Sequence, residues 1–308
     1  MKAYERDVEP LISLADIAEI ELVILKRVRG LIMGDHRGVS VGSGFDFVGL
    51  RDWQPGDRPS AIDWGQSTLN NFSPLIVREF EQPSTAPVYA LVDLSLSTRL
   101  GVNGALITAT VMRALATIGL SAVFFQDPFG LMTFDEGFKH IGSIRPRTGK
   151  GHVVHCLDAY QQRRGLDPTR RVHEISTTLA GLMRTRSMLA VISDFLFDDT
   201  QTVLHELSLL NATHDVFLVL VDSSSAYEMP KVSSGWIDVV DVESGRTRTL
   251  SRRRLAGLSA HVREWYDKLR RDAKDAGLDL VDVVPDQAKN EITLSEFIAE
   301  RKLRKTSN

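Results

Sequence analysis

The segment D-L-S-L-S at residues 93–97 brings together three side chains with oxygen ligands, Asp93, Ser95 and Ser97. A carboxylate and two hydroxyls in one tight loop are hard ligands of the kind that Mg²⁺, Mn²⁺ and Ca²⁺ prefer. Asp194, which follows a second apolar run, could add another carboxylate. The pattern is short, and Asp and Ser also cap helices and close turns. A cation site and a helix cap are therefore both hypotheses at this point.

Both loops follow short apolar runs, at residues 88–92 and 188–192, that are typical of buried parallel strands. Apolar residues at helical spacing predict helices between and after them, at residues 104–122, 200–210 and 255–273. Strands that alternate with helices predict an α/β fold with a doubly wound, mostly parallel sheet of Rossmann-like type. Because ligands of such sheets bind at the carboxyl ends of the strands, both loops fall where we expect a site.

Composition divides the chain into three regions. Residues 1–85 contain an N-terminal helix, for which Ser13 and Asp16 predict a capping box, and then an irregular, partly β subdomain rich in glycine and tryptophan. Residues 86–284 carry the alternation of strands and helices. Residues 285–308 form a closing helix with a basic end.

The glycine- and tryptophan-rich subdomain has candidate residues of its own. Trp53 and Trp64 are large enough to bury wide areas and to fix this subdomain on the sheet. Arg51, Asp57 and Asp63 are expected to form one charge-assisted network. Two interpretations stay open for these residues, a structural scaffold and a surface that binds a partner.

Several runs in and beyond this subdomain resemble a bacterial family. The runs are Gly42-Ser43-Gly44-Phe45-Asp46-Phe47, Arg51-Asp52-Trp53-Gln54-Pro55-Gly56-Asp57, Ile62-Asp63-Trp64 and Val77-Arg78-Glu79-Phe80-Glu81. Together they resemble the family named domain of unknown function fifty-eight, whose members are similar to von Willebrand factor A proteins and accompany MoxR-type AAA+ ATPases. The order strand, D-x-S-x-S, helix and a later strand ending in Asp likewise resembles the von Willebrand factor A fold with its metal-ion-dependent adhesion site.

The resemblance implies that Asp93, Ser95, Ser97 and Asp194 hold Mg²⁺, or alternatively Mn²⁺ or Ca²⁺. The related sites also use a Thr from a third loop, and His152 is expected in that place here, so weak binding and no binding are both open. The implied function is a non-enzymatic interaction module that presents its metal to a carboxylate of a partner. The implied partner is a MoxR-type AAA+ ATPase, and the implied process is the assembly or maturation of an unknown client complex.

Two other functions stay open. One is a metal-dependent phosphoester hydrolase that uses Asp93 and Asp194 as metal ligands; the absence of a general base near the loop argues against it. The other is a purely structural domain without metal. Three further signals are incomplete. G-V-S-V-G at residues 38–42 lacks the strand and helix of a hydrolase elbow, residues 149–151 lack the rest of a phosphate loop, and residues 152–156 lack further zinc ligands.

Composition bounds the remaining classes. The 308 residues include one cysteine, which excludes an intrachain disulfide framework. They carry 37 basic and 40 acidic side chains, and this near balance excludes a strong overall attraction to nucleic acid or anionic lipid. The start of the chain lacks the apolar core of a signal peptide, and the longest uninterrupted apolar runs are too short to span a membrane. We therefore expect a soluble, cytoplasmic protein.

Overall fold

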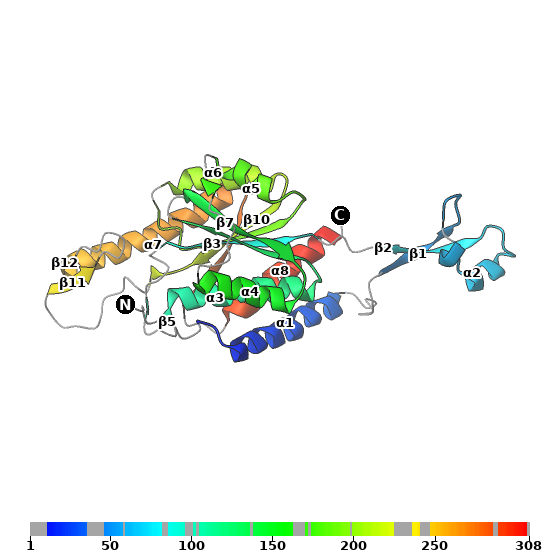
Figure 1. Ribbon diagram of the computed structural model, residues 1–308, viewed down its shortest axis with the longest axis horizontal. Helices are drawn as coiled ribbons and strands as arrows, with labels where there is room; N and C mark the ends of the chain where they lie inside the picture. Colours follow the sequence, from blue (N-terminus) through cyan, green and yellow to red (C-terminus); the bar gives the residue numbers. More distant parts are fainter. Residues whose placement is uncertain are drawn as a thin grey trace, which may run out of the picture. The chain divides into compact units, whose positions relative to one another are not determined.

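The chain forms two compact units (Figure 1). The computed structural model describes residues 11–35, 46–57, 59–81, 86–95, 101–102, 105–135, 138–162, 170–171, 174–197, 199–224, 236–240, 247–285 and 289–306. Residues 30–85 make up the smaller unit, and residues 1–29 and 86–308 make up the larger one, which we call the core unit. The N-terminal helix thus packs with the core unit, although the sequence analysis grouped it with the tryptophan-rich subdomain.

A seven-stranded sheet forms the centre of the core unit. Its strands, in spatial order, are β13 (Asp279–Val283), β10 (Asp215–Val221), β9 (Met188–Ser193), β3 (Val88–Asp93), β6 (Phe129–Phe134), β7 (His140–Arg147) and β8 (Arg170–Arg171). The first five are parallel, whereas β7 is antiparallel to β6 and β8 is antiparallel to β7. The prediction of an α/β fold with a mostly parallel sheet is confirmed.

The order of the strands creates a switch point in the middle of the sheet. Starting at β7 and leaving out the short β8, the strands appear in the order third, second, first, fourth, fifth and sixth along the chain. This is the order of doubly wound sheets that bind ligands where the direction of winding reverses. Here the reversal lies between β3 and β9, the two strands that the sequence analysis singled out.

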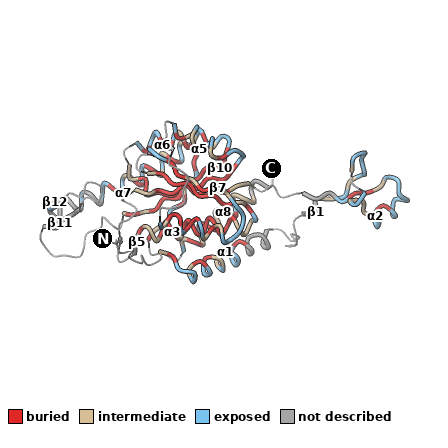
Figure 2. The backbone as a smooth tube through the Cα atoms, viewed as in Figure 1, coloured by how far each residue is buried: buried red, intermediate tan, exposed pale blue. Residues whose placement is uncertain are grey.

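Helices cover both faces of the sheet, which explains why β3, β6, β9 and β10 are buried along their whole length (Figure 2). One face carries α1 (Leu14–Asp35), α3 (Ile107–Phe124), α4 (Lys150–Gln162) and α8 (Asn290–Thr306). The other face carries α5 (Ile175–Leu182), α6 (Thr200–Asn211) and α7 (Arg252–Asp275). Helix α3 is the central one, and it packs closely on α4 at Gly119, where a Cβ would lie 2.7 Å from the Val153 side chain.

Helix α1 begins at the predicted capping box. Asp16 accepts hydrogen bonds from the backbone and hydroxyl of Ser13, at 2.8 and 2.6 Å, and its own N–H donates to the Ser13 hydroxyl at 3.1 Å. The helix continues through Gly30 to Asp35. Arg113 on α3 pairs with Asp16 at 2.9 Å and with Glu291 on α8 at 2.6 Å, so one guanidinium ties three helices together.

The last helix closes the edge of the sheet at which the parallel strands begin, which we call the amino edge. Arg301 on α8 pairs with Asp215 and Asp279, the first residues of β10 and β13. Its guanidinium also lies 5.3 Å from the centre of the Phe217 ring and 5.2 Å from that of Phe297. The next residue, Lys302, pairs with Asp127, which precedes β6.

Shorter elements complete the chain. In the small unit, β1 (Asp46–Asp52) pairs antiparallel with β2 (Ile76–Glu81), and η1 (Pro59–Ala61) and α2 (Trp64–Leu69) lie between them in the sequence. In the core unit, β4 (Gly101–Val102) pairs with β5 (Ala105–Leu106), and β11 (Trp236–Val240) pairs with β12 (Thr247–Ser251). The turn that joins β11 and β12 lies outside the described residues.

Candidate functional site

The switch point brings the two predicted loops to the same edge of the sheet, which we call the carboxyl edge. Asp93 ends β3, Ser193 ends the neighbouring β9, and Asp194 follows directly. Ser95 is two residues beyond Asp93, in the described part of that loop. Ser97, the remaining predicted ligand, lies outside the described residues.

Asp93 is a buried carboxylate, only 1% exposed, that is held by uncharged donors. One of its oxygens accepts a hydrogen bond from the Ser95 backbone N–H at 2.7 Å, and the other accepts from the Ser193 hydroxyl at 2.6 Å. Burial raises the pKa of Asp93 above its usual range, and these hydrogen bonds only partly offset that effect. Among the described groups that act on this carboxylate there is no cation.

Asp194 lies in a tight loop on the other side of the switch point and is also 1% exposed. One oxygen of its carboxylate accepts a hydrogen bond from the Leu196 backbone N–H at 3.2 Å. Phe195 has a positive φ of 52° and donates its N–H to the Ser193 hydroxyl at 2.8 Å. Ser193 therefore connects the two loops, because its hydroxyl donates to Asp93 and accepts from Phe195. The sequence analysis did not include this residue.

Two more aspartates complete a row along the carboxyl edge that the sequence analysis missed. Asp135 follows the end of β6, and Asp222 follows the end of β10. Four neighbouring strands, β10, β9, β3 and β6, therefore each end at or one residue before an aspartate. In the sequence, an aspartate stands at or shortly after the end of each of these four apolar runs, but only Asp93 and Asp194 were predicted as site residues.

The added aspartates have partners of their own. Asp135 accepts a hydrogen bond from the His140 backbone N–H at 2.7 Å, and its other oxygen lies 2.6 Å from Nδ1 of the same histidine. Its charge further raises the pKa of Asp93. Asp222 lies 3.4 Å from the guanidinium of Arg270 on α7. Of these aspartates, Asp222 at the β10 end of the row has an arginine beside it, whereas Asp93 in the middle of the row has none among the described groups.

Two tyrosine hydroxyls contact the carboxyl edge, one from α4 and one from α7. The Tyr160 hydroxyl, at the end of α4, donates to the backbone carbonyl of Asp93 at 3.3 Å. The Tyr266 hydroxyl, on α7, lies 2.8 Å from the Ser223 hydroxyl, and burial together with the charge of Asp194 raises the pKa of Tyr266 above its usual range. The Tyr266 phenol therefore stays protonated at neutral pH, and both hydroxyls act as hydrogen-bonding groups.

The expected third loop of the site is not where the sequence analysis placed it. Strand β7 runs antiparallel to β6 and pairs Arg147 with Phe129 at the amino edge, so His152 in the first turn of α4 lies at the edge opposite to Asp93. Its ring nitrogen lies 3.6 Å from Sγ of Cys156, which is fully buried and whose pKa is raised to about 12 by that burial. His152 therefore neither replaces nor blocks a metal ligand.

The oxygen donors at the carboxyl edge are of the type that binds a hard cation, but few of them are carboxylates. Carboxylate oxygens of Asp93 and Asp194, each with more than one lone pair, and the hydroxyl of Ser95 are the chemical type that Mg²⁺ prefers. In the part of the chain that the structure describes, no three His, Cys, Asp or Glu side chains are grouped to hold a metal. A cation here would therefore depend on two carboxylates supplemented by serine hydroxyls and water.

In the small unit, Arg51 and Asp57 form a two-pronged ion pair. Both guanidinium–carboxylate distances are 2.7 Å, and Asp57 also accepts from the Gln54 backbone N–H at 2.8 Å. The turn between them contains Gly56 with a φ of 112°, a conformation that favours glycine. These bonds lower the pKa of Asp57 to about 2, with Arg51 as the main cause.

Asp63 belongs to a second, separate pair. Its carboxylate caps α2 by accepting from the Gln66 backbone N–H at 3.1 Å, and it pairs with Arg78 on β2 at 2.8 Å. The prediction of one network made by Arg51, Asp57 and Asp63 is therefore wrong, because each aspartate has an arginine of its own.

The predicted burial of the two tryptophans is also wrong. Trp53 is 38% exposed and Trp64 is 57% exposed. A two-stranded sheet with one short helix has too little interior to enclose two indoles. Backbone hydrogen bonds and the two ion pairs, instead of buried indoles, stabilise this part of the small unit.

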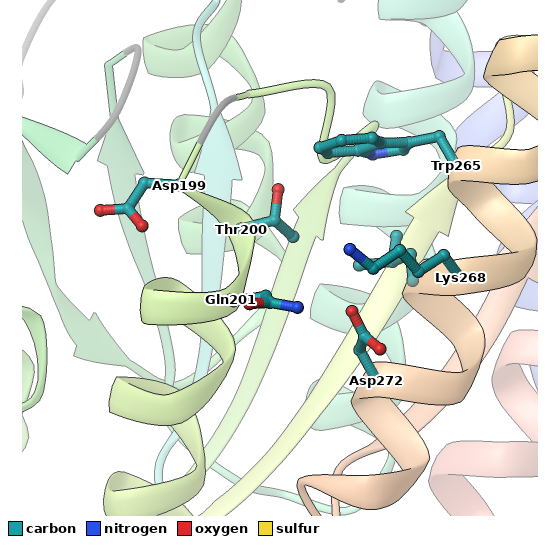
Figure 3. Close-up of a pocket in the computed structure, with 7 residues that line it drawn as sticks. Asp199, Thr200, Gln201, Trp265, Lys268 and Asp272 are labelled. Atoms are coloured by element: carbon teal, nitrogen blue, oxygen red, sulfur yellow. The ribbon is translucent and has the colours of Figure 1, made fainter.

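A pocket of about 210 Å³ lies between the start of α6 and α7 (Figure 3). It is lined by Asp199, Thr200, Gln201, Trp265, Lys268, Leu269 and Asp272. The indole of Trp265 covers one end of it, and Lys268 points from α7 toward α6. The Trp265 N–H donates to the Phe195 carbonyl at 3.1 Å, so the wall of the pocket is bonded to the loop that carries Asp194. None of the predicted site residues lines this pocket.

Comparison with known proteins gives both a family and some distant relatives. The sequence model of a family described as "Protein of unknown function DUF58" matches residues 49–276. An uncharacterized protein of Mycobacterium tuberculosis, Rv1480, is 25% identical over 246 residues, which cover 77% of this chain and 73% of that protein. A counterpart in Mycobacterium bovis, Mb1516, is 25% identical over the same length.

Two solved structures are similar at low identity. An aerotolerance-related membrane protein of Bacteroides fragilis aligns with a TM-score of 0.41 at 11% identity, covering 71% of this chain and 99% of that one. The conserved hypothetical protein BatB of Bacteroides thetaiotaomicron aligns with a TM-score of 0.39 at 13% identity, covering 72% and 98%. At these scores the similarity carries no argument about activity or partners.

The comparisons correct the predicted cytoplasmic location. One of the two similar solved proteins is described as a membrane protein, so the expectation of a cytoplasmic location is not retained. Among the described residues, one helix, α3, is long and apolar enough to cross a membrane by length and composition. Within the structure 72% of that helix is buried, as is typical of a central core helix.

Proposed function

Because the chain belongs to the DUF58 family of proteins of unknown function, which the tryptophan-rich runs already indicated, we propose that it is a non-enzymatic protein-interaction module. We further propose that residues 86–284 form a domain of von Willebrand factor A type, flanked by residues 1–85 and 285–308. The order of the strands and the position of the D-x-S-x-S loop at the switch point support this proposal.

The proposal depends most on one observation, the environment of Asp93. This carboxylate is 1% exposed, accepts hydrogen bonds from the hydroxyl of Ser193 and the backbone of Ser95, and has no cation among the described groups that act on it. A buried carboxylate costs free energy unless a positive charge compensates it. A divalent cation from solution would supply that charge.

In the proposed site, Asp93, Ser95 and Asp194 hold the cation together with Ser97. Bound Mg²⁺, or Mn²⁺ or Ca²⁺, would supply an open coordination position for a carboxylate of a partner protein. The protein's own contribution is to orient the two loops, since the Ser193 hydroxyl fixes Asp93 and the Phe195 N–H relative to each other.

The proposed partner is a MoxR-type AAA+ ATPase, as the family resemblance implies. In this scheme the ATPase supplies the work of remodelling, and the present chain recruits or positions a client during assembly or maturation of another complex. The carboxylate that completes the metal site would come from the ATPase or from the client.

Calorimetric titration with MgCl₂ and MnCl₂ tests the metal site. We expect saturable binding by the wild-type chain, loss of that binding in Asp93→Ala, and unchanged binding in Asp275→Ala, an exposed aspartate on α7. Absence of binding by the wild type at millimolar metal would contradict the metal-dependent form of the proposal.

Affinity purification tests the partner. A tagged chain should retain a MoxR-type AAA+ ATPase from its native lysate in the presence of Mg²⁺, and EDTA or Asp93→Ala should release it. An ATPase that is retained equally well in EDTA would show an interaction through another surface. Failure to retain the ATPase under either condition would contradict the proposed partnership.

The alternative of a metal-dependent phosphoester hydrolase is favoured by one observation. The sequence analysis found no general base, but His140 and Asp135 form a 2.6 Å pair at the same edge of the sheet as Asp93. A histidine oriented by a carboxylate is a common general base. Turnover of phosphomonoester or phosphodiester substrates that is abolished by both Asp93→Ala and His140→Gln would make this alternative the better one.

A further inference from the structure

Exposed apolar side chains are concentrated in the small unit. Nine large hydrophobic residues are exposed in the part of the chain that the structure describes, and five of them lie between residues 30 and 85. These five are Leu50, Trp53, Trp64, Leu69 and Phe72. The small unit contributes far fewer residues than the core unit, so this is a marked local excess.

Backbone hydrogen bonds place four of the five at one end of the small unit. The chain at the start of β2 has a neighbouring segment on each side. The Trp53 N–H donates to the carbonyl of Leu75, the residue before β2, at 2.7 Å, and the Asp63 N–H donates to the carbonyl of Ile76, its first residue, at 2.8 Å. Neighbouring strands lie about 4.8 Å apart, so the backbones at residues 53 and 63 are about 10 Å apart. Trp64 directly follows Asp63.

Helix α2 adds the other two side chains. Leu69 ends this helix, and the Phe72 N–H returns to donate to the carbonyl of Ser67 at 2.8 Å. Phe72 has a positive φ of 60°, an uncommon conformation for an aromatic residue, and the residue is 52% exposed. We call the group formed by Trp53, Trp64, Leu69 and Phe72 the aromatic end.

The polar residues of the family runs are explained by the fold of the small unit, whereas the tryptophans are not. Arg51 and Asp57 close the Gly56 turn, and Asp63 caps α2 and pairs with Arg78. Trp53 and Trp64 contribute little to any interior, although tryptophan gains more than any other residue from burial. Exposed tryptophans grouped with other apolar side chains are typical of binding surfaces.

The charge of the small unit indicates which partner suits this surface. Residues 30–85 contain seven carboxylates and four guanidinium groups, which gives an excess of three negative charges. The carboxylates are Asp35, Asp46, Asp52, Asp57, Asp63, Glu79 and Glu81, and the arginines are Arg37, Arg51, Arg58 and Arg78. This excess repels a second copy of the unit and an anionic lipid surface, and it attracts a basic polypeptide.

We propose that the aromatic end binds a basic polypeptide segment, with an apolar side chain of that segment on the indoles and its Lys or Arg residues over the ring faces and beside the carboxylates. Arginine and lysine bind tryptophan faces through cation–π attraction, and the negative charge of the small unit attracts the same cations. This surface does not include the metal site, and binding to it is independent of Asp93.

Selection from a displayed library of random 15-residue peptides tests the proposal on the full chain. Peptides retained by the wild type but not by the double variant Trp53→Ser/Trp64→Ser should be enriched in Lys and Arg near an aromatic or aliphatic residue. The affinity of a selected peptide, measured by fluorescence anisotropy, should fall at least ~10-fold in each single variant, as is usual for a central tryptophan. Leu209→Ser, a similarly exposed apolar residue on α6, is the matched control and should leave the affinity unchanged.

Four results would overturn the proposal. They are equal retention of the peptides by the double variant, enrichment of acidic peptides, tighter binding of the chain to phosphatidylglycerol vesicles than to the peptides, and a dimer in sedimentation that the double variant abolishes. Asp93→Ala should bind the peptides as the wild type does, which separates this surface from the proposed metal site. The far-UV circular dichroism of each variant should match that of the wild type, because both indoles are exposed.

Discussion

Aspartates lie at both edges of the core sheet, and the groups that surround them differ. At the amino edge, Asp215 and Asp127 are 5% and 3% exposed and pair with Arg301 and Lys302, two consecutive residues of α8. At the carboxyl edge, Asp93 is 1% exposed and is held by a serine hydroxyl and a backbone N–H. Equally buried carboxylates thus have cations at one edge and neutral donors at the other.

The difference separates a structural role from a binding role. When a buried carboxylate is paired with a cation, removal of either partner leaves an uncompensated buried charge and strongly destabilises the fold. A buried carboxylate held only by neutral donors lowers stability, because hydrogen bonds offset part of its desolvation but supply no opposite charge. We infer that the amino edge holds the sheet to its last helix, whereas the carboxyl edge is kept ready for a charge from outside.

The largest expected effect is at the amino edge. Arg301→Ala should lower the free energy of unfolding by ~3–5 kcal/mol, because it leaves Asp215 buried without its cation and removes the contacts with Phe217 and Phe297. Urea unfolding followed by circular dichroism measures the change. Arg186→Ala, an exposed arginine, is the control and should change stability by less than ~0.5 kcal/mol. A loss below ~1 kcal/mol for Arg301→Ala would mean that the pair is not structural.

The same substitution at the two edges should have different effects. Asp215→Asn should destabilise the chain by ~2–3 kcal/mol, because Arg301 loses its most buried partner. Asp93→Asn should leave stability unchanged or raise it by up to ~1 kcal/mol, because the amide removes a buried charge while its oxygen still accepts a hydrogen bond. Both are measured by urea unfolding in EDTA. Losses of equal size would contradict the division of the two edges.

Much of this arrangement follows from the sequence. The runs before Asp93 and Asp194 are apolar on both faces, which only a strand covered by helices on both sides tolerates, so the parallel sheet and its carboxyl edge could be predicted. The same pattern before Asp135 and Asp222 was equally readable. Ser193 could not be assigned, because its role comes from the register between β3 and β9, two strands about 100 residues apart in the chain.

The errors have physical causes too. Strand β7 runs from His140 to Arg147 and carries the chain across to the amino edge. Its last six residues, Gly142-Ser143-Ile144-Arg145-Pro146-Arg147, have little strand propensity, so their pairing with β6 could not be predicted from the sequence. The burial of Trp53 and Trp64 was wrong because residue type does not reveal how much interior a small unit has.

A smaller effect tests whether the carboxyl edge uses a charge from outside. With 10 mM MgCl₂ the wild type should be stabilised by ~1–2 kcal/mol, the gain expected when the ligand is present at about ten to thirty times its dissociation constant. Asp93→Asn should gain nothing, whereas Asp215→Asn, already destabilised, should gain as much as the wild type. Thermal unfolding with and without the salt measures this, with NaCl at the same ionic strength, about 30 mM, as the control. Equal gains in all three chains would show only a general effect of salt.

The smallest effect is the pH dependence of the stability that Asp93 contributes. Because the folded chain raises the pKa of Asp93 above its value of 3.8 in an unfolded chain, the folded state binds this proton more tightly. Stability contributed by this group is therefore present at low pH and is lost as the pH rises from about 3.8 through the folded pKa. The advantage of Asp93→Asn over the wild type should accordingly grow over that window, by less than ~1 kcal/mol, and then level off.

Urea midpoints in EDTA at intervals between pH 4 and pH 8 measure this difference, with Asp275→Asn as the control that should follow the wild type at every pH. An advantage that stays constant with pH would mean that Asp93 is no harder to ionise in the folded chain than in the unfolded one. In that case the carboxyl edge would already contain its compensating charge, and the contrast with the amino edge would disappear. A growing advantage that Mg²⁺ reverses would instead assign the missing charge to the cation.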